Sequence, residues 1–141
     1  MTSQLRLHRP EVPSELLEIE RAIEESRSIL DLRDDWDGEG SPGYAADVLD
    51  RANDFLIENA VHLWTTYGLR VDAPVIGPGP NGSIDIHWRT TDRSLLVNIP
   101  ADDDEVATFY GDDRRDPARR TVEGRLELST QNHWLLMWLA L

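Results

Sequence analysis

Two stretches of the chain repeat apolar residues at the spacing of an α-helix. In the first, residues 14–32, apolar side chains recur every three or four positions, and Ser14 stands where a helix N-cap is expected. The second, residues 44–67, has a longer apolar stripe and is followed by Gly68, a residue type common at helix C-termini. An acidic, glycine-rich break at residues 34–43 separates them, so the pattern predicts a hairpin of two helices.

Beyond the second helix, the pattern changes from helical spacing to alternation. A proline-rich stretch, residues 74–80, predicts an edge segment or a loop, and the following Asn81-Gly82 pair predicts a turn. Four later segments are predicted to be strands: 83–89, 95–99, 105–110 and 122–128. The first, second and fourth of these place apolar side chains at every second position, as in strands with one buried face. Because the turns between them are short, we expect an antiparallel meander of three or four strands.

The last predicted element is a short helix over residues 130–140, with Ser129 as its cap. The apolar faces of the strands need a cover, and the helices can provide it. The predicted fold is therefore α+β: an N-terminal helical hairpin packed on a three- or four-stranded antiparallel meander, with a short apolar C-terminal helix. A length of 141 residues fits one domain over residues 1–141, in which residues 1–12 form a flexible arm.

Composition and charge narrow the functional classes. The chain has 27 carboxylates against 14 arginines and no lysine, which gives a net charge of −13. Such a chain is repelled by nucleic acid and attracted to basic partners. Cysteine is absent, which excludes a disulfide scaffold and a cysteine-based metal site. Neither a signal peptide nor a long apolar run is evident, so we expect a cytoplasmic protein without membrane contact and without a cofactor.

The break between the two predicted helices gathers carboxylates and glycines at residues 34–40. Clustered carboxylates on a glycine-rich loop can bind a hard cation such as Ca²⁺, but the register of an EF-hand fails, because the twelfth ligand position falls on Tyr44 or Ala46. A structural role is simpler, and contact with a partner is the other alternative; we predict no metal. In the structural interpretation, Trp36 closes the open end of the helical hairpin and Asp37 accepts hydrogen bonds from turn amides. Gly38 and Gly40 then adopt positive φ.

This loop and a later segment resemble a group of small, uncharacterised bacterial proteins. These share a Trp-Asp-Gly-x-Gly loop and a Pro-x-x-[Asp/Asn]-Gly-Gly-Ile-x-[Leu/Ile]-x-Trp hairpin. Here residues 36–40 match the loop and residues 78–88 match the hairpin, with Ser83 in place of the second glycine. The resemblance covers about residues 29–110 and implies a shared fold element without implying an activity.

Three other groups of polar residues are weaker candidates for a site. The histidines lie in different predicted elements, without the i, i+4 spacing of a helical zinc site: His8, His62, His87 and His133. Acidic residues at 102–105 and 112–113 fall in predicted turns, where we expect them to behave as ordinary surface carboxylates in contact with water. Four arginines could grip an anion, but aspartates are interleaved with them: Arg114, Arg115, Arg119 and Arg120. We find no pairing of a nucleophile with a base, and predict no catalytic residues and no enzymatic activity.

The strongest functional indication is the apolar segment 133–141. As a helix it is apolar nearly all round, so it is either buried entirely in its own domain or partly docked on another chain. Tryptophan and methionine are enriched in the cores of interfaces. We hypothesise a protein-interaction module that binds a protein partner or a second copy through Trp134, Met137, Trp138 and Leu141. The alternative is an acidic inhibitor, such as an antitoxin or an immunity protein, that neutralises a basic partner.

Overall fold

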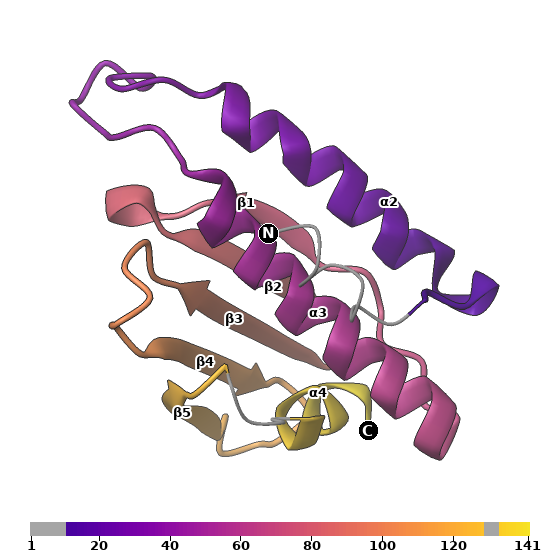
Figure 1. Cartoon of the computed structure of the whole chain (residues 1–141). Coiled ribbons are helices and arrows are strands. Elements are labelled where there is room, and N and C mark those ends of the chain that lie inside the picture. The colour runs from indigo at the N-terminus through magenta and orange to yellow at the C-terminus, as the bar shows by residue number, and fades with distance from the viewer. Residues whose placement is uncertain (1–10, 129–132) are drawn as a thin grey trace.

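A computed structural model describes residues 11–128 and 133–141, and it has helices on one face of an antiparallel sheet (Figure 1). The α-helices are α2 (Leu17–Ser26), α3 (Ala46–Tyr67) and α4 (His133–Ala140). The strands are β1 (Val75–Pro78), β2 (Ile84–Arg89), β3 (Arg93–Ile99), β4 (Ala107–Asp113) and β5 (Thr121–Leu126). Short 3₁₀ segments cover Ser14–Leu16, Arg27–Asp31 and Pro80–Gly82. The predicted α+β class is confirmed.

The sheet has five strands in the order β1-β2-β3-β4-β5, so the prediction of three or four strands was wrong. The additional strand is the proline-rich segment, in which Ile76 lies opposite Ile86 of β2. Prolines are tolerated there because β1 is an edge strand and needs hydrogen bonds on one side only. Each strand pairs antiparallel with its neighbour in sequence, as a meander requires.

The N-terminal helical region differs from the prediction at its start. A 3₁₀ turn precedes α2, and the N-cap is Pro13, which makes no side-chain capping bond. The Leu16 N–H donates to the Pro13 carbonyl at 2.9 Å, so a main-chain group does what Ser14 was expected to do. Val12, which was assigned to the flexible arm, is half-buried against the core, and residues 1–10 lie outside the described residues.

The end of α3 follows the prediction. Gly68 adopts a left-handed conformation with φ of 65°, which glycine accepts without steric penalty. Its N–H donates to the Trp64 carbonyl at 2.9 Å, and the Leu69 N–H donates to the Leu63 carbonyl at 3.2 Å. These two bonds satisfy carbonyls at the end of the helix and turn the chain toward β1.

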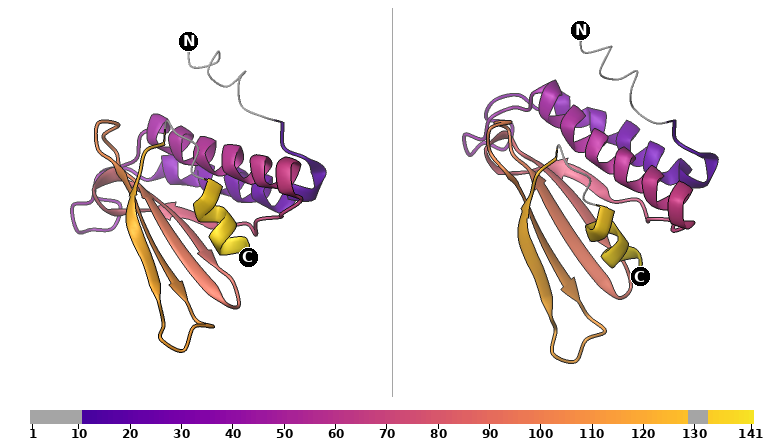
Figure 2. Two further views of the ribbon diagram at one scale, coloured as in Figure 1. Left: turned by 90° about the horizontal axis from the view of Figure 1, so that it is seen from below. Right: turned by 60° about the horizontal axis from the view of Figure 1, so that its bottom comes forward.

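The core lies between the sheet and the helices. Figure 2 shows all three α-helices on the same face of the sheet, where α2 contacts β1, α3 contacts β2 and β3, and α4 contacts β3. The strand residues that face them are fully buried: Ile84, Ile86, Trp88, Leu95, Val97 and Ile99. The opposite face carries a row aligned by the strand register, which consists of Val75, His87, Leu96, Tyr110 and Glu123. No described helix covers this row, and Val75 is 73% exposed.

Two predictions about the C-terminal region fall on residues that the structure does not describe. The Ser129 cap and the first turn of the predicted helix lie in the range 129–132, and the helix is described from His133. None of the helices in the described ranges combines the length and the apolar character needed to cross a bilayer.

Candidate interaction surface at the C-terminal helix

The helix α4 has a buried side and a partly exposed side. On the buried side, Leu135 and Leu136 are 0% exposed and Leu139 is 5% exposed. These three side chains complete the core between α3 and the sheet. The prediction that segment 133–141 contributes to an interface therefore applies to the other side of the helix alone.

The four residues predicted to bind a partner form this other side. They are spaced i, i+3, i+4 and i+7, which places them in one stripe along a helix: Trp134, Met137, Trp138 and Leu141. Trp134 is 50% exposed and Leu141 is 66% exposed. The side chains of Met137 and Trp138 are half-buried against the core.

Trp138 is held over β4 because β4 has a glycine beneath it. A Cβ atom added to Gly111 would lie 2.8 Å from the Trp138 ring and 2.9 Å from the Val122 side chain, so a larger residue would displace the ring. The Arg93 guanidinium lies 4.8 Å from the Trp138 ring centroid, and it also donates to the Trp138 carbonyl. Trp138 therefore holds α4 against the sheet. The part of its ring that is not covered by these contacts contributes to the exposed side of α4.

Trp134 lies against β4, the strand next to the edge strand β5. Its ring meets the Phe109 ring edge to face, with centroids 5.6 Å apart. Phe109 pairs with Gly124 of β5, and a Cβ atom on Gly124 would be 3.0 Å from the Phe109 ring. Because Gly124 has no side chain, β5 leaves space beside the Phe109 ring at this position. Trp134, Phe109 and Gly124 therefore form an apolar ledge at the edge of the sheet.

The two edges of the sheet differ in their ability to pair with another strand. Pro74 precedes β1 and Pro78 ends it, and proline has no N–H to donate. In contrast, β5 contains no proline from Thr121 to Leu126, and alternates exposed charged residues with smaller ones. We use the name β5 edge surface for the outer edge of β5 together with the Trp134 ring.

Charge is distributed unevenly between the helical layer and the β5 side. Residues 11–58, which include α2 and most of α3, hold fifteen carboxylates and four arginines, a net charge of −11. Residues 111–126, which include β5, hold five arginines and four carboxylates, a net charge of +1. The strand β5 thus lies in a segment that lacks the negative charge of residues 11–58, at the side of the sheet farthest from α2 (Figure 1).

The carboxylates of the acidic loop are used by the loop itself. Asp37 accepts from the Glu39 amide at 3.0 Å and from the Ser41 hydroxyl, and Asp35 accepts from the Gly40 amide at 2.7 Å. Gly38 and Gly40 have positive φ, of 74° and 81°. The arrangement supports a structural role for Asp37 and the two glycines, because the carboxylates that a cation would need already accept hydrogen bonds from the loop.

Trp36 does not close the end of the helical layer as expected. It is 39% exposed, and its indole N–H donates to the Pro42 carbonyl at 3.1 Å. Its ring lies 6.2 Å from the Tyr44 ring, in a tilted contact. The loop curls back on itself, so Trp36 packs on residues of its own loop and stays out of the core.

The Asp37 carboxyl gives the loop a dependence on pH. Its hydrogen bond with the Ser41 hydroxyl, followed by that with the Glu39 amide, lowers the Asp37 pKa from its ordinary value of 3.8. A lowered folded-state pKa means that the stabilisation is present above pH 3.8 and is lost as the pH falls through the folded value. We expect Asp37→Asn to lower the melting temperature slightly at neutral pH, and the difference from wild type to shrink below pH 3.8. Thermal melts from neutral pH to acid check this; a pH-independent difference would contradict it.

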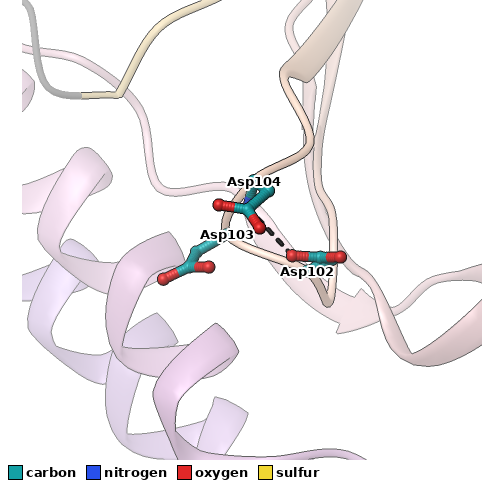
Figure 3. Close-up of side chains that lie close together, drawn as sticks. All are labelled: Asp102, Asp103 and Asp104. Carbon is teal, nitrogen blue, oxygen red and sulfur yellow. Dashed lines mark hydrogen bonds between the residues drawn. The ribbon is translucent and has the colours of Figure 1, made fainter.

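The acidic turn before β4 brings three carboxylates together. Asp102, Asp103 and Asp104 each place an oxygen within 4.8 Å of the others, and all three are exposed. In Figure 3 the Asp104 amide donates to the Asp102 carboxylate, a bond of 2.9 Å that closes the turn. In the described residues this group is the one whose spacing could hold a cation. Since all three side chains are exposed to water and one oxygen is already used, the geometry is that of a solvated turn.

The arginine cluster after β4 is engaged by neighbouring carboxylates and carbonyls. Arg119 contacts Asp112 at 2.8 Å and Arg120 contacts Asp116 at 3.2 Å, while Arg114 donates to the Thr90 carbonyl. Within this cluster, partial burial tends to raise the pKa of Asp113, but hydrogen bonds from the Arg115 amide and Arg93 outweigh it and lower that pKa. Through these contacts the cluster links the β4–β5 hairpin to the β2–β3 hairpin.

The structure brings two of the predicted separate histidines together. The rings of His62 on α3 and His133 on α4 are in a tilted contact, with centroids 4.3 Å apart. The Nδ1 atom of His133 is buried without a hydrogen-bond partner in the described part of the chain. Sequence spacing could not reveal this pair, because its members lie far apart along the chain. His87 lies in the open sheet row, and His8 lies outside the described residues.

A cleft of about 290 Å³ opens beside the turn between β2 and β3. Its charged lining includes Arg70, Asp92 and Arg115. Arg115 lies 3.8 Å from Asp92, so opposite charges within the cleft partly neutralise each other. The volume is at the lower limit for small-molecule sites, and the lining is more polar than such sites usually are.

No protein-family model matches this chain, and neither a curated protein nor a solved structure is similar to it.

Proposed function

We propose that this chain is a non-enzymatic protein-interaction module that binds through the β5 edge surface. The observation that carries the proposal is Trp134, an aromatic side chain that is 50% exposed on an apolar ledge beside a proline-free strand edge. Large aromatic residues on exposed ledges are common anchors of interfaces, and unprotected strand edges accept additional strands. The other predicted residue that is strongly exposed, Leu141, extends the same stripe.

The proposal can be tested by affinity capture from the host with Trp134→Ala. We expect the tagged wild-type chain to retain a stoichiometric partner, which includes an untagged copy of the chain itself, and the variant to lose most of it. Truncation of a central aromatic anchor commonly weakens binding by about 2 kcal/mol or more, roughly thirtyfold. Tyr67→Ala is the matched control, because Tyr67 is 53% exposed at the end of α3. Equal capture by wild type and the Trp134 variant would refute the proposed surface.

A second candidate function is an acidic inhibitor that neutralises a basic partner. The net charge of −11 over residues 11–58 favours it, since such a surface steers a basic protein toward the helical layer. The same capture experiment separates the two functions. A partner held by the helical layer is released when salt screens the charges and is retained by the Trp134 variant. A partner held by the β5 edge surface behaves in the opposite way.

A further inference from the structure

The main chain of β5 is oriented to accept another strand. In an antiparallel ladder, residues that exchange hydrogen bonds with the neighbouring strand alternate with residues that do not. The Asp113 N–H donates to the Arg120 carbonyl at 3.1 Å, so the main chain of Arg120 points toward β4, and by alternation so does that of Val122 and Gly124. Three residues therefore direct their N–H and carbonyl groups away from β4: Thr121, Glu123 and Arg125.

We propose that a second copy of this chain pairs with this edge, β5 against β5, about a twofold axis at Gly124. The proposal rests on the proposed function and names the partner for the same surface. In this register Glu123 of each copy lies opposite Arg125 of the other, in a pair that exchanges main-chain hydrogen bonds. Antiparallel pairing about one twofold axis requires a self-complementary edge, and the sequence of β5 provides one.

The side chains of Glu123 and Arg125 are placed for this contact. They lie opposite Tyr110 and Thr108 of β4, on the face of the sheet that the described helices leave open. Both are exposed, so they can reach across the junction without disturbing the core. Opposite charges directly across two strands attract, and like charges there repel. The twofold axis makes two such ion pairs for each dimer.

The residue at the axis and the helix above it also fit a second copy. Gly124 would face its own equivalent in a closely spaced pair without hydrogen bonds, where side chains approach most closely. Because it has no side chain, the two strands can approach. The axis is perpendicular to the sheet, so both copies have their helices on the same face. Each Trp134 then lies over β4, the strand next to β5. The two Trp134 rings then lie on the same face of the joined sheet, one on each side of the junction.

Charge and topology favour this edge over the rest of the molecule. Two chains of net charge −13 repel each other, but the segment 111–126 has a charge of +1. The opposite edge of the sheet is obstructed by Pro74 and Pro78, so pairing there would lack donors. The β5 edge is therefore the edge at which two copies can meet with the least repulsion and with its donors intact.

Sedimentation equilibrium of the full chain and of charge-reversed variants tests the proposal. We expect the wild type to form a dimer at chain concentrations between about 1 µM and about 1 mM. Glu123→Arg and Arg125→Glu should each weaken it about tenfold or more, because every reversal creates two repulsive contacts. An equimolar mixture of the two variants should restore a one-to-one heterodimer, since both contacts across the junction then join opposite charges. The double variant, with both charges exchanged, should dimerise like the wild type.

The control is Glu20→Arg, which makes the same change of charge on the exposed side of α2. It should leave the dimer unweakened. A wild type that stays monomeric throughout, a single variant that dimerises like wild type, or a mixture no better than its components would each overturn the proposal. If the wild type is monomeric yet captures another protein in a Trp134-dependent way, self-pairing fails and the proposed function stands. If Trp134→Ala neither dissociates a dimer nor reduces capture, both fail.

Discussion

Replacing Trp88 with alanine is expected to lower the free energy of unfolding by about 3–5 kcal/mol, as truncation of a large buried aromatic residue does. Trp88 is 0% exposed between the sheet and the helices. Its indole N–H donates to the Asp72 carbonyl at 2.9 Å, so the substitution also removes the donor to that carbonyl. Urea unfolding followed by circular dichroism should show a lower midpoint with an unchanged slope.

Trp36→Ala is the matched control for this prediction. Trp36 is 39% exposed and its contacts are within its own loop, so the loss of stability should be a minor fraction of that at Trp88. If the two variants lose equal stability, the assignment of Trp88 to the core and of Trp36 to the surface is refuted.

The second large effect is expected at α4, where Leu136→Ala should cost about 2–5 kcal/mol of folding stability. Leu136 is 0% exposed and packs in the core, so its truncation leaves a cavity. Trp134→Ala should cost less than this, because Trp134 is 50% exposed and its truncation leaves no closed cavity. Thermal and urea unfolding of both variants measure the difference.

The same pair of variants separates the packing of α4 in the core from its proposed role in binding. Leu136→Ala should unfold more easily while the folded fraction still binds, and Trp134→Ala should stay folded while binding is lost. For this reason deletion of α4 is a poor test of the interface, because it removes three core leucines together with the exposed stripe. A Trp134 variant that is as unstable as the Leu136 variant would assign the whole helix to the core.

Alternation predicted strands where one face of a strand is buried and the other is not. Ile84, Ile86 and Trp88 show this pattern, and β2 is found where it was expected. The proline-rich strand β1 was not predicted as a definite strand, because Gly77 and Pro78 break the alternation. Ser14 was misassigned because a proline carbonyl and a 3₁₀ turn begin the helical region without a side-chain cap.

The candidate surface was predicted in part. The stripe from Trp134 to Leu141 was predicted from its composition. The sequence of a helix that is apolar all round does not indicate which side is buried. The side that is buried depends on Gly111 and Gly124, which lack the side chains that would otherwise occupy the space beneath Trp138 and beside Phe109. Such contacts join residues far apart in sequence, and no local pattern reports them.

The separation of charge in this fold makes the molecule an electric dipole. Its negative end is the helical layer together with the acidic loop, with −11 over residues 11–58, and its other end is the region of β5. A positively charged surface would rotate the approaching chain until the helices face it, and the β5 edge would then point away. A basic protein at one end and a second copy at the other would therefore not compete, and one chain could link two unlike neighbours.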